Sequence, residues 1–150
     1  GGIRCSLKDM LTWVAMWLDP QSTWLSQAQR RAVWTLQMPM PISQRAREWD
    51  NTHMYGYGFG WRIADVDGQW KVAHTGTLAG MYSSVAMLPD RRNGFVILTN
   101  GEGEAARTVL GEALVKRWTE PQAHRDAAYY AGLLDREDAA RPASSRNSQT

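Results

Sequence analysis

The chain has 150 residues, 43% of them hydrophobic and 21% charged, a composition that suits one globular domain and excludes a wholly disordered chain. Its net charge of +2, from 17 basic and 15 acidic side chains, gives no support to nucleic-acid binding. No apolar run approaches the ~18 residues of a membrane span, so we expect no membrane span in this chain. A lone Cys5 and widely separated histidines provide no local metal-binding motif.

Two helices are predicted near the start of the chain. Ser6 followed by Asp9 is a variant of the capping box, and apolar residues at helical spacing follow it as far as Leu18. A second helix is predicted from Ser26 to Gln37, because a proline follows shortly afterwards.

Closely spaced turn signals in the middle of the chain predict an antiparallel meander of strands. Asp67-Gly68 is a strong hairpin signal, and residues 70–75 are expected to form the returning strand. Gly76 and Gly80 are expected to bracket a loop. Further strands are predicted at 81–88 and 95–99, with an Asn93-Gly94 turn between them.

A last helix is predicted over 104–118, so helices flank an antiparallel sheet and the fold class is α+β. Residues 1–119 are expected to form the folded part, and residues 120–150 a linker or disordered tail. The last fifteen residues carry no aromatic and no large aliphatic side chain. Within 120–150, only the stretch from Tyr129 to Leu134 has the apolar character needed for docking.

An ordered set of motifs carries a resemblance to a known family: Y-G-F-G-W at 57–61, H-T-G at 74–76, Gly80, L-P-D at 88–90 and G-F-V-I-L-T-N at 94–100. Over roughly residues 1–119 the chain resembles the C-terminal portion of serine β-lactamase-like hydrolases. It is most similar to the class C branch, with its D-aminopeptidases and penicillin-binding-protein-like relatives. The resemblance implies the C-terminal part of the β-lactamase/transpeptidase-like fold, and it implies no metal or organic cofactor.

The resemblance also assigns roles to the H-T-G box, which replaces the K-T-G box of class A enzymes. His74, Thr75 and Gly76 would line the substrate site, and the backbone amide of Thr77 would help to hold the oxyanion. An imidazole is a weaker fixed positive charge than a lysine ammonium at pH 7, which favours an esterase or D-peptidase over an efficient penicillinase. Arg107 is similar to a substrate-binding arginine of some class C enzymes, although a solvated first-turn arginine fits it equally well.

The nucleophile and its base are absent from this chain. No serine is followed by a lysine three positions later, and the family's Y-x-N motif is also lacking. Because both motifs lie upstream in the family, we expect this chain to be the C-terminal part of an acyl-enzyme-forming hydrolase and to be inactive alone. The missing N-terminal part of the same fold is then its partner. The substrate would be a small molecule or peptide: an ester, amide, D-peptide or β-lactam.

Two alternatives remain open at this point. One is a non-catalytic module that recognises cell-wall peptide or sugar, which the eight tryptophans invite, although aromatic residues in helix and strand patterns are more often core. The other is a pseudoenzyme whose longer form also lacks the nucleophile. Family habit places such proteins in the periplasm or outside the cell.

Overall fold

The computed structural model describes residues 3–140, which divide into two compact units at Gly103 and Glu104. The first unit contains α1 (Leu7–Leu18), α2 (Gln27–Trp34), β1 (Met38–Pro39), α3 (Gln44–Asp50), β2 (Tyr55–Tyr57), β3 (Arg62–Val66), β4 (Gln69–Leu78), β5 (Met81–Leu88), the 3-10 turn η1 (Pro89–Arg91) and β6 (Asn93–Thr99). The second contains α4 (Glu104–Thr119), the 3-10 turn η2 (Pro121–Ala123) and α5 (Ala127–Ala140).

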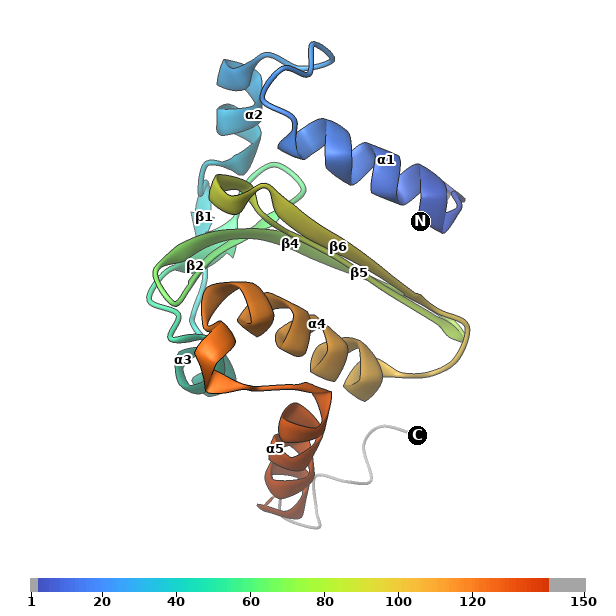
Figure 1. Cartoon of the computed structure of the whole chain (residues 1–150), viewed down its shortest axis with the longest axis vertical. Helices are drawn as coiled ribbons and strands as arrows, with labels where there is room; N and C mark the ends of the chain where they lie inside the picture. The colour runs from blue at the N-terminus through green and yellow to red at the C-terminus, as the bar shows by residue number, and fades with distance from the viewer. Residues whose placement is uncertain (1–2, 141–150) are drawn as a thin grey trace. The chain divides into compact units, whose positions relative to one another are not determined.

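The first unit is built on one six-stranded sheet whose spatial order is its sequence order, β1 to β6. Every neighbouring pair is antiparallel. The predicted meander and the α+β class are therefore confirmed. Figure 1 shows α1 running along one face of the sheet beside β6.

Local capping decides where the first two helices begin. Ser6 accepts a hydrogen bond from the Asp9 amide while the Asp9 carboxylate accepts one from the Ser6 amide, which is the predicted capping box. Ser26 and Gln29 form the same reciprocal pair at the start of α2. This helix ends at Trp34 rather than at Gln37, because the following residues become extended and Gln37 donates a backbone hydrogen bond to Tyr57 beside β2.

The turns differ in how well the sequence predicted them. Asp67 and Gly68 both have positive φ angles, 50° and 75°, and they join β3 to β4 in the predicted two-residue hairpin. The expected loop boundary at Gly76 was wrong, since this residue lies inside β4 and only residues 79–80 separate β4 from β5.

The Asn93-Gly94 turn was also wrong, because both residues belong to β6 and the residue with positive φ (53°) is Arg92. Gly94 has a packing role instead. A Cβ atom there would lie 2.8 Å from a Val14 methyl group and 3.2 Å from the Ala86 carbonyl oxygen, so the glycine lets α1 approach the sheet closely.

The hydrophobic core of the first unit lies on the face of the sheet that α1 covers. Its buried members come from α1, from the residue before β3, and from strands β3, β4 and β5: Val14, Trp17, Trp61, Ile63, Val72, Val85 and Met87. Tryptophan rings fill much of this layer, with Trp13 stacked on Trp61 at 5.3 Å and Trp17 stacked on Trp34 at 5.0 Å between ring centroids.

Two polar clusters connect β3 and β4 to the segment around α3. The Asp65 carboxylate accepts backbone hydrogen bonds from His53 (2.8 Å) and Met54 (2.7 Å) and lies 3.3 Å from the His53 imidazole. Burial alone would raise the pKa of Asp65, but these hydrogen bonds outweigh it and hold the pKa below its usual value. Nearby, the Lys71 ammonium forms an ion pair with the buried Asp50 carboxylate at 3.1 Å.

In the second unit, α4 begins and ends close to the predicted limits, but α5 was not predicted. Residues 127–140 form a helix where a linker or disordered tail was expected, and the tail beyond residue 140 lies outside the described residues. Tyr130, inside the stretch singled out for docking, is completely buried. No helix in residues 3–140 combines the length and the apolar character needed to cross a membrane.

Candidate functional site

The H-T-G box lies on a part of β4 that extends past its neighbour β3. The pairing of β3 with β4 ends at Arg62 and Ala73, whereas β5 continues to pair with β4 as far as Leu78. His74, Thr75 and Gly76 follow Ala73 directly, and Thr77 comes next. Four of the five predicted site residues therefore lie on one extended segment that projects beyond the end of β3.

Strand alternation divides these four residues between the two faces of the sheet. Val72 is fully buried in the core on one face of the sheet, so positions 74 and 76 of the strand are on that same face. Thr75 and Thr77 start from the opposite face. The backbone of the segment, rather than its side chains, is the feature common to all four positions.

The His74 imidazole meets the aromatic ring of Tyr57, at the end of β2. Its centroid lies 6.3 Å from the ring centroid of Tyr57, in an edge-on arrangement with an interplanar angle of 64°. Tyr57 is the last residue of β2 and pairs in register with Arg62, the first residue of β3. Tyr57 thus contacts His74 on β4 and Arg62 on β3, whereas Arg62 pairs with Ala73 and starts from the sheet face opposite His74.

Arg62 fixes the position of the Tyr57 phenol. Its Nε donates a hydrogen bond to the Tyr57 hydroxyl oxygen at 2.8 Å, and its Cζ lies 5.8 Å from the Tyr57 ring centroid. This hydrogen bond raises the pKa of Arg62, so the guanidinium stays charged. Sequence reasoning assigned no site role to either residue, although Tyr57 opens the Y-G-F-G-W motif that carries part of the resemblance.

The glycine of the box leaves room for the side chain of its partner on β5. Gly76 pairs with Ser83, and a Cβ atom at position 76 would lie 2.5 Å from the Ser83 hydroxyl oxygen. No real Cβ atom tolerates such a distance, so any larger residue at Gly76 must displace Ser83.

The remaining predicted site residue, Arg107, belongs to the second unit. It lies in the first turn of α4, is mostly buried, and forms an ion pair with Glu104 at 3.8 Å. This contact gives Arg107 a local electrostatic partner, and its role toward a substrate stays a prediction.

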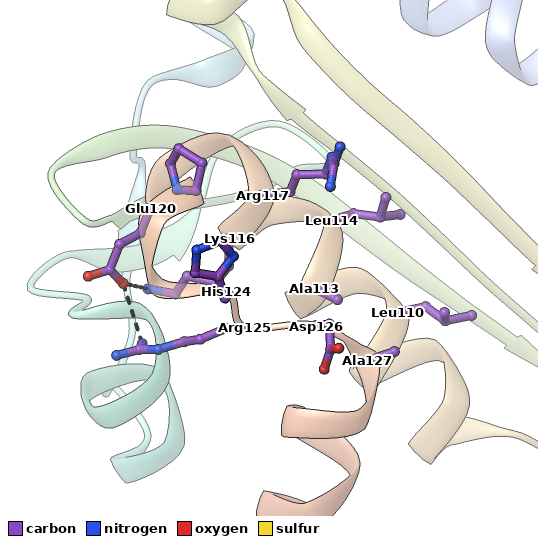
Figure 2. A pocket seen from close by; sticks show the side chains of 11 residues that line it. Leu110, Ala113, Leu114, Lys116, Arg117, Glu120, His124, Arg125, Asp126 and Ala127 are labelled. Carbon is purple, nitrogen blue, oxygen red and sulfur yellow. Dashed lines mark ion pairs between the residues drawn. The ribbon is translucent and has the colours of Figure 1, made fainter.

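A hollow of about 370 Å³ lies within the second unit, between the end of α4 and the start of α5 (Figure 2). Glu120 lies at its side and forms ion pairs with the Lys116 ammonium at 3.9 Å and the Arg125 guanidinium at 3.5 Å. One carboxylate thus offsets the charge of two cations. None of the motifs found in the sequence reaches this hollow.

The tryptophans do not form a binding surface. Seven of the eight are buried or half-buried, and only Trp24 is exposed, at 39%. A sugar- or peptide-binding module would need several of these rings on one exposed face. Their packing therefore gives the binding-module alternative no support.

Comparisons with known proteins agree with this architecture. A family model described as Beta-lactamase matches residues 1–117. A solved structure, "Structure of the octameric penicillin-binding protein homologue from Pyrococcus abyssi", matches with a TM-score of 0.67 at 16% identity. The match covers 89% of this chain but only 27% of that one, and it shows a shared fold.

No curated protein matches the chain. The family match covers most of the chain, and the family is one of serine-hydrolase type. The chain therefore belongs to the beta-lactamase family.

Proposed function

We propose that this chain is the C-terminal part of a serine hydrolase that forms an acyl-enzyme on an ester, amide, D-peptide or β-lactam. The observation that carries the proposal is the projection of β4 beyond β3, with the H-T-G box on the projecting segment. An extended edge of this kind suits a substrate that aligns along it as an added strand.

Each residue of the projecting segment has a distinct role in the proposal. The Thr77 amide is one of two donors to the oxyanion that develops when an acyl carbonyl is attacked. Gly76 lets the substrate approach the backbone closely, because it has no side chain. The Thr75 hydroxyl and the His74 imidazole hydrogen-bond to the substrate.

The nucleophile and base come from a segment upstream of residue 1 in the proposed longer protein. Within the described chain β6 is the last strand of the sheet, so an upstream strand can extend the sheet there. An upstream Ser-x-x-Lys motif would place its amine one helical turn from its hydroxyl, where it can accept the proton of the attacking serine. The chain alone is then inactive.

Sequencing about two hundred codons upstream of Gly1 tests the proposal most directly. We expect an open reading frame that contains Ser-x-x-Lys followed by Tyr-x-Asn. An upstream frame without either motif would exclude acyl-enzyme formation by this route and would favour the pseudoenzyme alternative.

Covalent labelling separates the longer protein from the chain alone. Mass spectrometry after treatment with a fluorophosphonate should show one phosphonylated serine in the longer protein and none in residues 1–150. A stoichiometric adduct on a serine of this chain alone would contradict its proposed inactivity.

The family relationship also supports two proposals, one about the class of substrate and one about the cellular compartment. The substrate is a small molecule or peptide rather than a nucleic acid, consistent with the small net charge of the chain. The longer protein is proposed to act in the periplasm or outside the cell, which fractionation of the producing cells would test.

A further inference from the structure

Three exposed apolar side chains lie close together at the end of β4, the start of β5 and the end of β6. Leu78 is 61% exposed, Met81 51% and Leu98 47%. Leu78 pairs with Met81, and Leu98 pairs with Ser83, which follows Met81 by two residues on β5. Single exposed apolar residues are ordinary on a protein surface, whereas a contiguous apolar patch is a mark of a binding site. We call these three residues the apolar patch.

The apolar patch lies on the same face of the sheet as the first and last residues of the H-T-G box. Along β4, Leu78 follows Gly76 by two residues and His74 by four, so side-chain alternation puts all three on one face. Gly76 pairs with Ser83, which in turn pairs with Leu98 on β6, and residues that pair in register share a face. The box and the apolar patch are therefore neighbours on one surface.

The buried core on this face ends where the box begins. Val85 is the last buried residue of β5 toward the apolar patch, and it pairs with His74. The next pair, Gly76 and Ser83, carries little side-chain volume, because a glycine has no side chain and a serine has a small one. A group held over Gly76 therefore meets the apolar patch on the side away from the core.

The apolar patch is also within reach of a substrate bound at the box. Leu78 is the residue directly after Thr77, whose amide the proposed function assigns to the oxyanion. Neighbouring strands lie about 4.8 Å apart, which places Leu98 about 10 Å from Gly76 across the sheet. A chain attached to an acyl carbon at the Thr77 amide can therefore run over the apolar patch.

We propose that the apolar patch binds the acyl chain of the substrate, so that the longer protein selects substrates with a medium-length apolar acyl group over acetyl-sized ones. The acyl carbonyl lies at the Thr77 amide, and the chain lies across Leu78 and Met81 toward Leu98. Contact with the chain removes apolar surface from water on both sides, so binding strengthens with chain length. This inference rests on the proposed function.

Two matched fluorophosphonate probes test the inference in the longer protein. They differ only in the alkyl group on phosphorus, which is methyl in one and octyl in the other. The serine oxygen attacks phosphorus, the upstream base accepts the serine proton, and fluoride leaves, so the alkyl group takes the place of the acyl chain. Intact-mass spectrometry follows the rate of labelling. Each fully buried methylene is worth about fourfold, so even partial burial of the octyl chain should make its labelling at least about tenfold faster.

Substitutions in the apolar patch then locate the source of that preference. Leu78→Ser and Leu98→Ser should each lower the octyl-to-methyl ratio of labelling rates by about threefold to tenfold, because the chain loses an apolar contact. The double variant should lower the ratio further. Leu78→Met keeps an apolar side chain of similar volume, so it should keep most of the preference.

Leu110→Ser is the matched control, because it removes a leucine of similar exposure, 42%, from α4 in the second unit. It should leave the ratio of labelling rates unchanged. Equal rates for the two probes in the wild-type protein would overturn the inference while leaving the proposed function intact.

A ratio that stays unchanged in Leu78→Ser and Leu98→Ser would also overturn the inference. A lower thermal midpoint in those two variants would then assign the apolar patch to packing against the upstream part of the protein. Failure of both probes to label any serine would overturn the proposed function and this inference with it.

Discussion

Replacing Gly76 with alanine should destabilise the chain through one identifiable contact. The added methyl carbon would lie 2.5 Å from the Ser83 hydroxyl oxygen, whereas the next atom, the Ser83 Cβ, lies at 3.9 Å, an ordinary contact distance. Gly76 does not have a positive φ angle, so an alanine is acceptable to the backbone itself. The cost must therefore come from displacing a single oxygen atom.

The size of the effect follows from how easily that oxygen can move. Overpacking in a tightly packed region costs about 1–3 kcal/mol. Because a serine can relieve the contact by rotating about one bond, we expect Gly76→Ala to lower the free energy of unfolding by about 1 kcal/mol. Removing the oxygen should remove the cost. We therefore expect Gly76→Ala to lower the free energy of unfolding much less in a Ser83→Ala background than in the wild-type protein.

Urea unfolding of the four proteins in this double-mutant cycle measures the coupling between the two positions. Gly101→Ala is the neutral control, because a Cβ atom there meets no atom within 4 Å, and it should change stability by less than about 0.5 kcal/mol. Gly56→Ala is the severe control, because its Cβ would collide with the backbone carbonyl of Met38, which cannot rotate away. A loss on Gly76→Ala that is the same with serine or alanine at position 83 would refute the reasoning.

Three further predictions concern the packing of the first unit. Asp65→Asn should cost about 1–3 kcal/mol at pH 7, because the carboxylate accepts charge-assisted hydrogen bonds such as that from the Met54 amide. The pKa of Asp65 is lower in the folded than in the unfolded chain. The Asp65 carboxylate therefore stabilises the fold above its unfolded pKa of about 3.9, and this contribution is lost as the pH falls through the folded pKa. If acidification lowered the free energy of unfolding equally in the wild type and in Asp65→Asn, this prediction would be contradicted. Lys71→Met should cost about 3–5 kcal/mol, since it breaks the ion pair of the Lys71 ammonium with the buried Asp50 carboxylate, and a thermal midpoint close to that of the wild type would exclude the role of the pair. Ile63→Ala should cost about 2–5 kcal/mol, because Ile63 is completely buried in the core, and an unchanged urea midpoint would show that the core does not depend on it.

Local signals were sufficient where a structural feature depends on residues close together in sequence. The capping pair of Ser6 and Asp9 fixed the start of α1, and Asp67-Gly68 fixed the first tight hairpin. The strand at Met81–Leu88 was predicted to the residue. In each case the deciding interaction is a hydrogen bond or a backbone conformation set within four residues, or an apolar run bounded by turns.

The predictions failed where a distant part of the chain makes the choice. Asn93-Gly94 has the composition of a turn, but Gly94 lies in β6 because α1 packs against it. Gly76 resembles a loop boundary, but β5 pairs with β4 on both sides of it. The helix α5 was missed because its hydrophobic pattern is weak, and its Tyr130 is buried only through tertiary packing.

Some features of the candidate site could likewise be predicted from the sequence, whereas others depend on the tertiary structure. The sequence by itself determined the family, a strand of an antiparallel sheet that carries His74 and Thr75 of the H-T-G box, and the absence from this chain of a Ser-x-x-Lys nucleophile. Only the tertiary structure decided that β4 extends past β3 at Ala73 and that the Tyr57 ring, held by Arg62, meets His74 there. Motif residues are recognisable because they are adjacent in sequence, whereas the partners of His74 come from neighbouring strands, whose register and length are set by side-chain packing across the whole sheet.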